Sequence, residues 1–382
     1  MDSTYILLQN YWWFLVSLLG SLVVFLMFVQ GGNSLIFRLG KTDEERTLLV
    51  NSTGRKWEFT FTTLAVFGGG FFASFPLFYS TSFGGAYWLW MIILFSFVLQ
   101  AVSYEFQSKL GNILGKRTYQ CFLVANGVIG PLLLGAAVAT FFNGSNFLVS
   151  KGNMSELSMP VISSWANGWH GLDAFADPWN IVLGLAVFFL ARLLGNMFFL
   201  NNISDDKLNL RCRRQLITDG IPFLIFFLAF VIRTLLKDGF AVNPDTQEVF
   251  MEPYKYLHNF IAMPVLLVLF LLGVVAVLFG LGKSILTPKY TRGIWFAGIG
   301  TVLTVLALLL SVGYNNTAYY PSTADLQSSL TLANSCSSQF TLKTMAYVSI
   351  LVPFVLAYIV YAWRSIDTKP ITKEELKEDH AY

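Results

Sequence analysis

Two apolar segments between Arg55 and Lys109 decide how the chain is organised. From residue 55 to residue 109 the sequence reads RKWEFTFTTLAVFGGGFFASFPLFYSTSFGGAYWLWMIILFSFVLQAVSYEFQSK. The first segment opens on Glu58 and the second closes on Glu105, and each carboxylate has basic residues nearby. Two successive membrane-crossing helices run in opposite directions, so both carboxylates are expected near one membrane face. The stretch therefore predicts a site that contains both of them.

Glu58 and Glu105 have two interpretations, and the sequence leaves both open. A carboxylate at the rim of the hydrocarbon layer is costly unless it is hydrated, paired or protonated. In one interpretation, both are interfacial residues that form salt bridges with Lys56 or Lys109. In the other, they form a pair that accepts and releases protons.

The composition excludes a soluble domain of this length. Of the 382 residues, 55% are hydrophobic and only 12% are charged, which is typical of a chain with several membrane spans. The three cysteines are widely spaced and form no CxxC or His-Cys cluster, so neither a disulfide framework nor a metal site is predicted. No catalytic motif occurs, and we expect no catalytic residue in this chain and no nucleic-acid partner. The first residues lack the basic region of a cleaved signal, so we expect the first span to be retained.

Nine apolar runs are long enough to cross the membrane as helices, which takes roughly 20 residues each. They lie at about residues 11–31, 59–79, 85–104, 119–142, 180–200, 216–236, 257–281, 290–313 and 341–363. The sequence thus predicts an all-α, polytopic membrane protein with nine transmembrane helices, arranged as two four-helix bundles plus one peripheral helix. We expect a first bundle over 1–143, an outer loop over 144–179, a second bundle over 180–314, and an outer loop, the ninth helix and a cytoplasmic tail over 315–382.

Basic residues indicate the orientation, because 19 of the 25 lysines and arginines lie in the segments that follow odd-numbered runs. They are Arg38, Lys41, Arg46, Arg55, Lys56, Lys109, Lys116, Arg117, Lys207, Arg211, Arg213, Arg214, Lys283, Lys289, Arg292, Arg364, Lys369, Lys373 and Lys377. By the positive-inside rule these segments and the C-terminus are cytoplasmic, and the N-terminus is outside. Glu58 and Glu105 are then predicted at the cytoplasmic face. The charged tail from Ile371 to Asp379 is expected to be solvated.

Histidines are too few and too peripheral to hold a haem within this chain alone. His170 lies in an outer loop, His258 at the expected outer start of the seventh helix, and His380 in the tail. A haem in the bilayer normally takes axial ligands such as His or Met from helices, and no histidine lies at mid-depth. His258 is either a ligand shared with a partner or a structural hydrogen-bonding group.

Two further ionisable residues fall within the apolar runs. Arg192 lies near the middle of the fifth run, where an unpaired charge is costly, so it should face protein, a polar headgroup or a subunit interface. Asp219 lies near the expected start of the sixth helix. A carboxylate there would stabilise the helix start through the helix dipole, and this is the role we expect for it.

A series of short motifs occurs in an order and spacing that match one family across almost the whole chain. The motifs are Tyr11-Trp12-Trp13, Lys41-Thr42-Asp43-Glu44-Glu45-Arg46, Asn51-Ser52, Trp57-Glu58, Gly68-Gly69, Phe72-Ala73-Ser74-Phe75-Pro76-Leu77-Phe78-Tyr79, Tyr104-Glu105-Phe106-Gln107-Ser108-Lys109, Ser329-Leu330-Thr331-Leu332-Ala333-Asn334, Ser337-Ser338-Gln339-Phe340-Thr341-Leu342 and Ile371-Thr372-Lys373-Glu374. With these motifs the sequence resembles subunit II of the cytochrome bd family of quinol oxidases.

The resemblance implies an integral subunit of a quinol:oxygen oxidoreductase in a bacterial cytoplasmic (inner) membrane. It implies a haem-bearing partner, subunit I, which holds haems b and d, and it leaves room for small single-helix subunits and a structural quinone. The acids that match Glu58 and Glu105 are placed in the family on a cytoplasmic proton route. Trp57 and His258 are expected at the partner or an interface, and Arg192 against a lipid or quinone.

Two departures from the family pattern bear on these routes. Family members often have acids near the cytoplasmic end of the first helix, whereas this chain reads Val29-Gln30-Gly31-Gly32-Asn33 there. A tryptophan associated with oxygen entry often stands five residues after the first acid, and here the position is Thr63. The oxygen route and the inner part of the proton route are therefore not carried over.

A secondary transporter is the alternative function. Nine helices, glycine-interrupted segments and a mid-membrane Arg192 are all compatible with transport of a solute. The order of the motifs and the missing haem ligands favour the oxidase subunit over the transporter.

Overall fold

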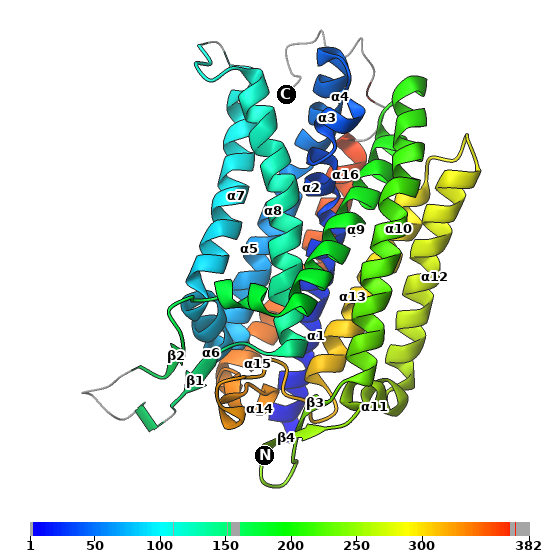
Figure 1. The fold of residues 1–382 in the computed structure, drawn as a ribbon. Helices are drawn as coiled ribbons and strands as arrows, with labels where there is room; N and C mark the ends of the chain where they lie inside the picture. The colour runs from blue at the N-terminus through cyan, green and yellow to red at the C-terminus, as the bar shows by residue number, and fades with distance from the viewer. Residues whose placement is uncertain (1–2, 110, 151, 154–160, 367–370, 372–382) are drawn as a thin grey trace.

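Long apolar helices run side by side along one direction and form most of the molecule (Figure 1). A computed structural model describes residues 3–109, 111–150, 152–153, 161–366 and 371. The long helices are α1 (Ser3–Leu26), α5 (Trp57–Ser74), α7 (Tyr87–Phe106), α8 (Lys116–Asn143), α9 (Pro178–Asn202), α10 (Asp206–Leu236), α12 (Pro264–Leu286), α13 (Gly293–Gly313), α15 (Gln339–Ser349) and α16 (Val352–Ile366). Within the described ranges, seven spans are long and apolar enough to cross a membrane, or up to nine if each of two bent helix pairs is one span.

Shorter elements join the long helices. The helical ones are α2 (Phe28–Asn33), α3 (Ile36–Leu39), α4 (Asp43–Gly54), α6 (Pro76–Phe78), the π-helix η1 (Tyr79–Gly85), η3 (Leu172–Ala176), α11 (Lys255–Ala262), η4 (Leu326–Ser328) and α14 (Leu332–Ser335). Two antiparallel hairpins pair β1 (Phe147–Val149) with β2 (Ser163–Trp165) and β3 (Gly239–Val242) with β4 (Val249–Glu252). The predicted all-α class is confirmed, since the strands among the described residues are these two short pairs between helices.

The helices α1 and α9 lie at the centre of the packing. Helix α1 packs against α5 and α13, and α9 packs against α2, α8 and α10. The contact between α2 and α9 is close because a Cβ at Gly31 would clash with the backbone of Ala191, and a Cβ at Gly195 would clash with Gly32. Because α8 contacts α9 and α1 contacts α13, the two predicted four-helix halves touch along their length. The division into those two bundles stays a prediction.

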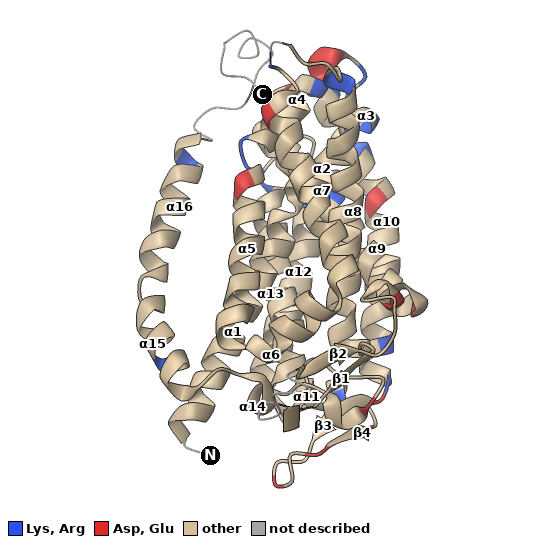
Figure 2. Cartoon of the chain, turned by 90° about the vertical axis from the view of Figure 1, so that its left-hand side faces the viewer, with Lys and Arg blue, Asp and Glu red and all other residues tan. Residues whose placement is uncertain are grey.

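The two ends of the bundle differ in what they carry. We call the upper end the one that holds α4, the start of α5, the end of α7 and the turn between α9 and α10, and the lower end the one that holds both hairpins (Figure 1). Helix α1 begins at the lower end and α16 ends at the upper end. Most lysines and arginines lie toward the upper end (Figure 2).

Several helix boundaries differ from the predicted runs for identifiable reasons. The second run breaks at Phe75, before Pro76, and the helical stretch Pro76–Gly85 is bent by 116° from the stretch that ends at Ser74. The seventh helix begins at Pro264 rather than near residue 257, because Met263 leaves helical geometry and Pro264 takes the first helical position. The sixth helix begins ten residues early, at Asp206, where the side chain of Asp205 caps it.

The connections at the lower end pair with one another, as expected for loops that fold over helix ends. Ser145 forms a β-bridge with Ser322, and Ala241 forms one with Thr317, which joins all three long connections. At the upper end, Ile371 is fully buried and bridges Ile203 in the turn between α9 and α10. The expectation of a solvated tail is therefore wrong for Ile371, and the rest of the tail lies outside the described residues.

Candidate functional site

Glu58 and Glu105 both lie at the upper end of the bundle. Glu58 is in the first turn of α5, and Glu105 is next to last in α7. Both side chains are exposed. Their neighbours Trp57 and Tyr104 stack on each other, with ring centroids 6.0 Å apart and planes 18° apart. The two acids therefore flank one aromatic pair that joins the start of α5 to the end of α7.

The hydroxyl of Tyr104 belongs to a cluster of buried hydrogen bonds. Its hydroxyl donates to Asn33 Oδ1 at 2.6 Å and lies 2.9 Å from Thr53 Oγ1, which itself donates to Asn33 Oδ1 at 3.1 Å. Tyr104, Asn33 and Thr53 are almost completely buried. Trp57, 9% exposed, packs in the same core cluster. Hydrogen bonds to α2 and α4 thus hold the aromatic pair in place, and the two acids are attached to residues of that pair.

The salt bridges expected in one interpretation of the two acids are not formed. Across the described ranges, Glu58 and Glu105 have no ion pair with Lys56, Lys109 or another basic side chain. Lys56 points elsewhere: it is fully buried, with its ammonium 4.6 Å from the ring of Trp363 on α16. The geometry leaves both carboxylates open at the surface of this chain.

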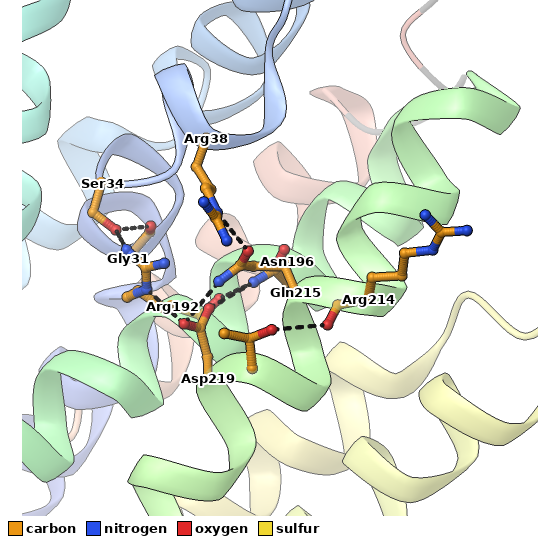
Figure 3. A network of polar contacts seen from close by, with 9 residues as sticks. Gly31, Ser34, Arg38, Arg192, Asn196, Arg214, Gln215 and Asp219 are labelled. Atoms are coloured by element: carbon orange, nitrogen blue, oxygen red, sulfur yellow. Dashed lines mark hydrogen bonds and ion pairs between the residues drawn. The ribbon is translucent and has the colours of Figure 1, made fainter.

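Arg192 forms a buried ion pair with Asp219 (Figure 3). Arg192 Nε lies 3.0 Å from Asp219 Oδ1, and the two side chains are 14% and 2% exposed. The guanidinium also donates to Ser34 Oγ at 3.3 Å, at the end of α2, and stacks near the ring of Phe188. Of the three environments expected for Arg192, the structure shows the first, because its charge meets a carboxylate of this chain from the next helix; a contact with a headgroup or a partner stays a prediction.

The carboxylate of Asp219 is further enclosed by amide groups. Gln215 Nε2 donates to Oδ1 at 3.0 Å, and Asn196 Nδ2 donates to Oδ2 at 3.3 Å. Arg38 Nε in turn donates to Gln215 Oε1 at 3.2 Å (Figure 3). A second guanidinium is therefore linked to Asp219 through the side chain of Gln215. Charge-assisted hydrogen bonds of this kind offset the cost of burying both ions. The network ties α2, α3, α9 and α10 together.

The role expected for Asp219 at a helix start is wrong. Helix α10 begins at Asp206, so Asp219 lies more than three turns inside it. The sequence signal was misleading because the apolar run begins near residue 216, whereas the helix includes the polar residues before it. Asp219 instead balances the charge of Arg192.

The histidines that the structure describes lie at the lower end, away from the two acids. His258 is on α11, not on the seventh span, and its Nδ1 lies 2.9 Å from Glu252 Oε1. Lys255 Nζ contacts the other oxygen of Glu252 at 3.1 Å. Burial raises the pKa of the Glu252 carboxyl, but the hydrogen bonds from His258 and Lys255 outweigh it and hold the pKa below its usual value. His170 stacks on Tyr87, and His380 lies outside the described residues.

Sequence reasoning missed a set of buried amides in the upper half. Gln30 Nε2 donates to Gln100 Oε1 at 2.7 Å, between α2 and α7, and Asn126 on α8 donates to Ser96 at 3.3 Å. All four side chains are buried. A signal was present: polar residues recur on α7 at helical spacing within an otherwise apolar run.

Comparisons with known proteins agree on one family. A family model described as cytochrome bd terminal oxidase subunit II matches residues 8–366. The chain is 26% identical over 388 residues to cytochrome bd-I ubiquinol oxidase subunit 2 of Escherichia coli K12, covering 98% of each chain. It is 25% identical to cytochrome bd ubiquinol oxidase subunit 2 of Bacillus subtilis 168, covering 96% of this chain and 99% of that relative.

A solved structure of the bd oxidase from Geobacillus thermodenitrificans shares the fold. The TM-score is 0.62 at 13% identity, over 95% of this chain and 98% of that chain. A solute-transport function finds no support in these likenesses. Because the family model spans nearly the whole length, the chain belongs to the cytochrome bd terminal oxidase subunit II family.

Proposed function

We propose that this chain is the haem-free integral subunit of a cytochrome bd-type quinol:oxygen oxidoreductase in a bacterial inner membrane. Its partner is the haem-bearing subunit I, which carries haems b and d and oxidises quinol. The observation that carries this proposal is the family match over residues 8–366. The two relatives matched over 98% and 99% of their own length are named as subunits of ubiquinol oxidases. The reduction of oxygen to water therefore takes place mainly in the partner.

One apolar cavity between the helices that the structure describes does not fit a haem, in keeping with the proposal that the haems lie in the partner. An apolar cavity of about 80 Å³ lies among α1, α5, α8, α9 and α13. Sites for molecules of drug size occupy about 300–1,000 Å³, and a haem also needs axial ligands. Among the described residues that line the cavity, Met27 offers a thioether and none is a histidine. No step in the chemistry is assigned to a haem bound here.

Glu58 and Glu105 form the entrance of a proton route from the cytoplasm. The support is their shared position at the upper end, their exposure, and the absence of ion pairs to them among the described side chains. A hydrated, unpaired carboxylate is able to take up a proton from solution and pass it on. The basic residues gathered at the same end support a cytoplasmic upper end, with the N-terminus outside (Figure 2).

The remaining contacts are assigned by their positions. Trp57 and its neighbour Glu58 are placed beside the partner subunit, and His258 at an interface on the outer side. Arg192 is 14% exposed, which leaves part of its side chain for a lipid or a structural quinone. Small single-helix subunits complete the assembly in this proposal.

A substitution of Glu58 tests the proton route. The Glu58→Gln change keeps the shape and hydrogen bonding of the side chain but removes its ability to ionise. We expect the purified two-subunit complex to keep its haem content and to lose turnover by about tenfold or more, as for loss of one proton-transfer group. Oxygen consumption with excess quinol, normalised to haem absorbance, measures this loss across pH 6 to 9.

Two matched variants serve as controls. Glu58→Asp keeps a carboxylate and should retain most of the activity. Glu44→Gln removes another exposed acid at the upper end, in the first turn of α4, and should leave turnover unchanged. If Glu58→Gln assembles normally and turns over at the parent rate, the proton role of Glu58 is wrong.

A further inference from the structure

A cavity of about 340 Å³ lies at the lower end of the bundle, opposite the end that holds Glu58 and Glu105 (Figure 1). We call it the lower cavity. Its walls come from η1, the start of α7, the end of α8, β2, η3 and the start of α9. Sites for small molecules occupy about 300–1,000 Å³. The lower cavity is therefore large enough for a small ligand, unlike the apolar cavity of about 80 Å³ among the long helices.

Two carboxylates line the lower cavity, and no lysine, arginine or histidine is among the described residues that line it. The carboxylates belong to Asp173 in η3 and to Asp177, the N-cap of α9. Lys237 is close enough to Asp177 to interact with its charge, but its ammonium bonds to Phe142 O and Asn143 Oδ1 in the wall. Negative charge is therefore in excess around the lower cavity, which disfavours an anionic ligand and favours a cation.

Each carboxylate uses one oxygen to hold the chain around it. Asp173 Oδ1 accepts hydrogen bonds from Trp165 Nε1 and Gly171 N, both at 3.0 Å. Asp177 Oδ1 accepts one from Trp179 N at 2.9 Å, which caps α9. Within the described ranges, the second oxygen of either carboxylate accepts no hydrogen bond, and neither residue forms an ion pair. The bonds to Oδ1 thus fix both side chains, and Oδ2 of each is left for a ligand.

The rest of the wall supplies aromatic rings and neutral polar groups. The rings are those of Trp90 and Trp165, which are partly buried, and of Tyr320, which is 2% exposed. Hydroxyl and amide groups come from Ser82, Thr140, Ser145, Asn146, Asn167 and Thr323. Aromatic rings attract cations to their faces. Hydroxyl and amide oxygens accept hydrogen bonds, and an ammonium group carries three donors and no acceptor.

We propose that the lower cavity binds a primary ammonium group, with Asp173 and Asp177 as its charged acceptors and the aromatic rings as part of its wall. Hydrogen bonds between an ammonium and a carboxylate are stronger than those between neutral groups. In the proposed orientation the lower cavity is on the outer side of the membrane, where a free alkylamine or the ethanolamine headgroup of a phospholipid presents this group. A neutral polyol is the competing ligand, but it leaves both negative charges unbalanced. The site lies apart from the proposed proton route and does not depend on it.

Equilibrium dialysis of the assembled oxidase tests the site, with radiolabelled n-butylammonium as the probe. The complex is held in nanodiscs of phosphatidylglycerol and is shown by mass spectrometry to be free of phosphatidylethanolamine. The uncharged control probe is 1-butanol, which has the same chain length. We expect saturable binding of one n-butylammonium per complex and none of 1-butanol. Equal binding of the two probes, or no saturable binding of n-butylammonium, would overturn the proposal, and this comparison needs no variant.

Matched variants test whether the two carboxylates hold the probe. Asp173→Asn and Asp177→Asn remove the charge but keep Oδ1 as an acceptor, and Asn is as good an N-cap as Asp. We expect each change to weaken n-butylammonium binding by about tenfold, the loss expected for one charge-assisted hydrogen bond. Asp245→Asn removes an exposed carboxylate between β3 and β4 at the same end and should leave the affinity unchanged. Parent affinity in both cavity variants, or an equal loss in Asp245→Asn, would contradict the site. If a cavity variant fails to assemble with its haems, the two-probe comparison on the parent decides.

Nanodiscs that contain phosphatidylethanolamine separate the two sources of the ammonium group. If the headgroup fills the lower cavity, native mass spectrometry should find one phosphatidylethanolamine retained by the parent and lost from the Asp173→Asn/Asp177→Asn double variant, and n-butylammonium should bind severalfold more weakly to the parent. If a free amine is the source, n-butylammonium should bind equally in both kinds of nanodisc. Either pattern supports the ammonium site. Saturable binding of glycerol in place of n-butylammonium would show a polyol site and overturn the proposal.

Discussion

Two groups of ionisable residues in the upper part of the molecule differ in burial and in pairing. Glu58 and Glu105 are exposed and have no ion pair among the described residues, whereas Asp219 is buried and bound to Arg192. The end of α2 connects the groups, because Asn33 bonds to Tyr104 and Ser34 to Arg192. An acid in an apolar helix therefore has a different role according to the groups that contact it. An open acid is available for proton exchange, and a paired acid holds helices together.

The largest expected effect comes from breaking the buried pair. Arg192→Leu leaves the carboxylate of Asp219 buried without its counter-ion, and loss of one partner from such a pair costs roughly 3–5 kcal/mol. We expect a sharp fall in the yield and thermal stability of the complex, measured by size-exclusion chromatography and unfolding in detergent. Arg214→Leu, an exposed arginine on α10, is the control and should have little effect.

The double variant Arg192→Leu/Asp219→Leu sharpens this test. It removes both charges, so it should recover much of the stability lost in Arg192→Leu, because apolar replacements of a buried ion pair are often neutral. Failure of the double variant to recover would mean that the arginine has another essential partner, such as a lipid headgroup or quinone.

A second prediction concerns whether the two open acids belong to one route. Glu58→Gln and Glu105→Gln are each expected to slow turnover, Glu58→Gln by about tenfold. If the acids act in series, the double variant should be no slower than the slower single variant, because residues that act as a unit are not additive. Thermal stability should stay at the parent value in all three. Losses that multiply in the double variant would indicate two independent routes.

A smaller effect is expected from the hydrogen bonds of the Tyr104 hydroxyl beneath the aromatic pair. Tyr104→Phe keeps the ring that stacks on Trp57 but removes the hydroxyl that bonds to Asn33 and Thr53. Loss of one buried hydrogen bond of this kind costs about 1 kcal/mol. Unfolding of the detergent-solubilised complex measures it, with Tyr79→Phe on the partly exposed π-helix as control. A stability loss as large as that of Arg192→Leu would show that the hydrogen bonds of Tyr104 stabilise this region as much as the ion pair does.

The smallest effect belongs to an ion pair at the surface of the lower end. Glu252 has a lowered pKa, so its contacts with His258 and Lys255 stabilise the fold above the unfolded value of 4.5 and are lost as the pH falls through the folded value. Because His258 is 52% exposed, the contribution is less than about 1 kcal/mol. The Glu252→Gln variant should melt slightly below the parent at pH 7, and the difference should shrink at pH 3, below the unfolded value. An equal difference at both pH values would contradict the pairing.

The amino-acid sequence by itself determined the class of the protein, the approximate spans and the end at which Glu58 and Glu105 lie. These follow from local quantities: the length of an apolar run, the charges that flank it and the alternating direction of successive helices. The sequence also carried enough ordered motifs to indicate the family. It failed at helix boundaries set by polar residues, as at Asp206, where hydrophobicity gives no signal.

Only the tertiary structure decided which side chains meet. The pairing of Arg192 with Asp219, the stacking of Trp57 on Tyr104 and the bond between Gln30 and Gln100 all join different helices. A membrane helix that is apolar on every side has no hydrophobic face from which its orientation can be read. Its orientation is fixed by close packing, such as the contact that Gly31 and Gly195 permit, and by the need of each buried polar group for a partner.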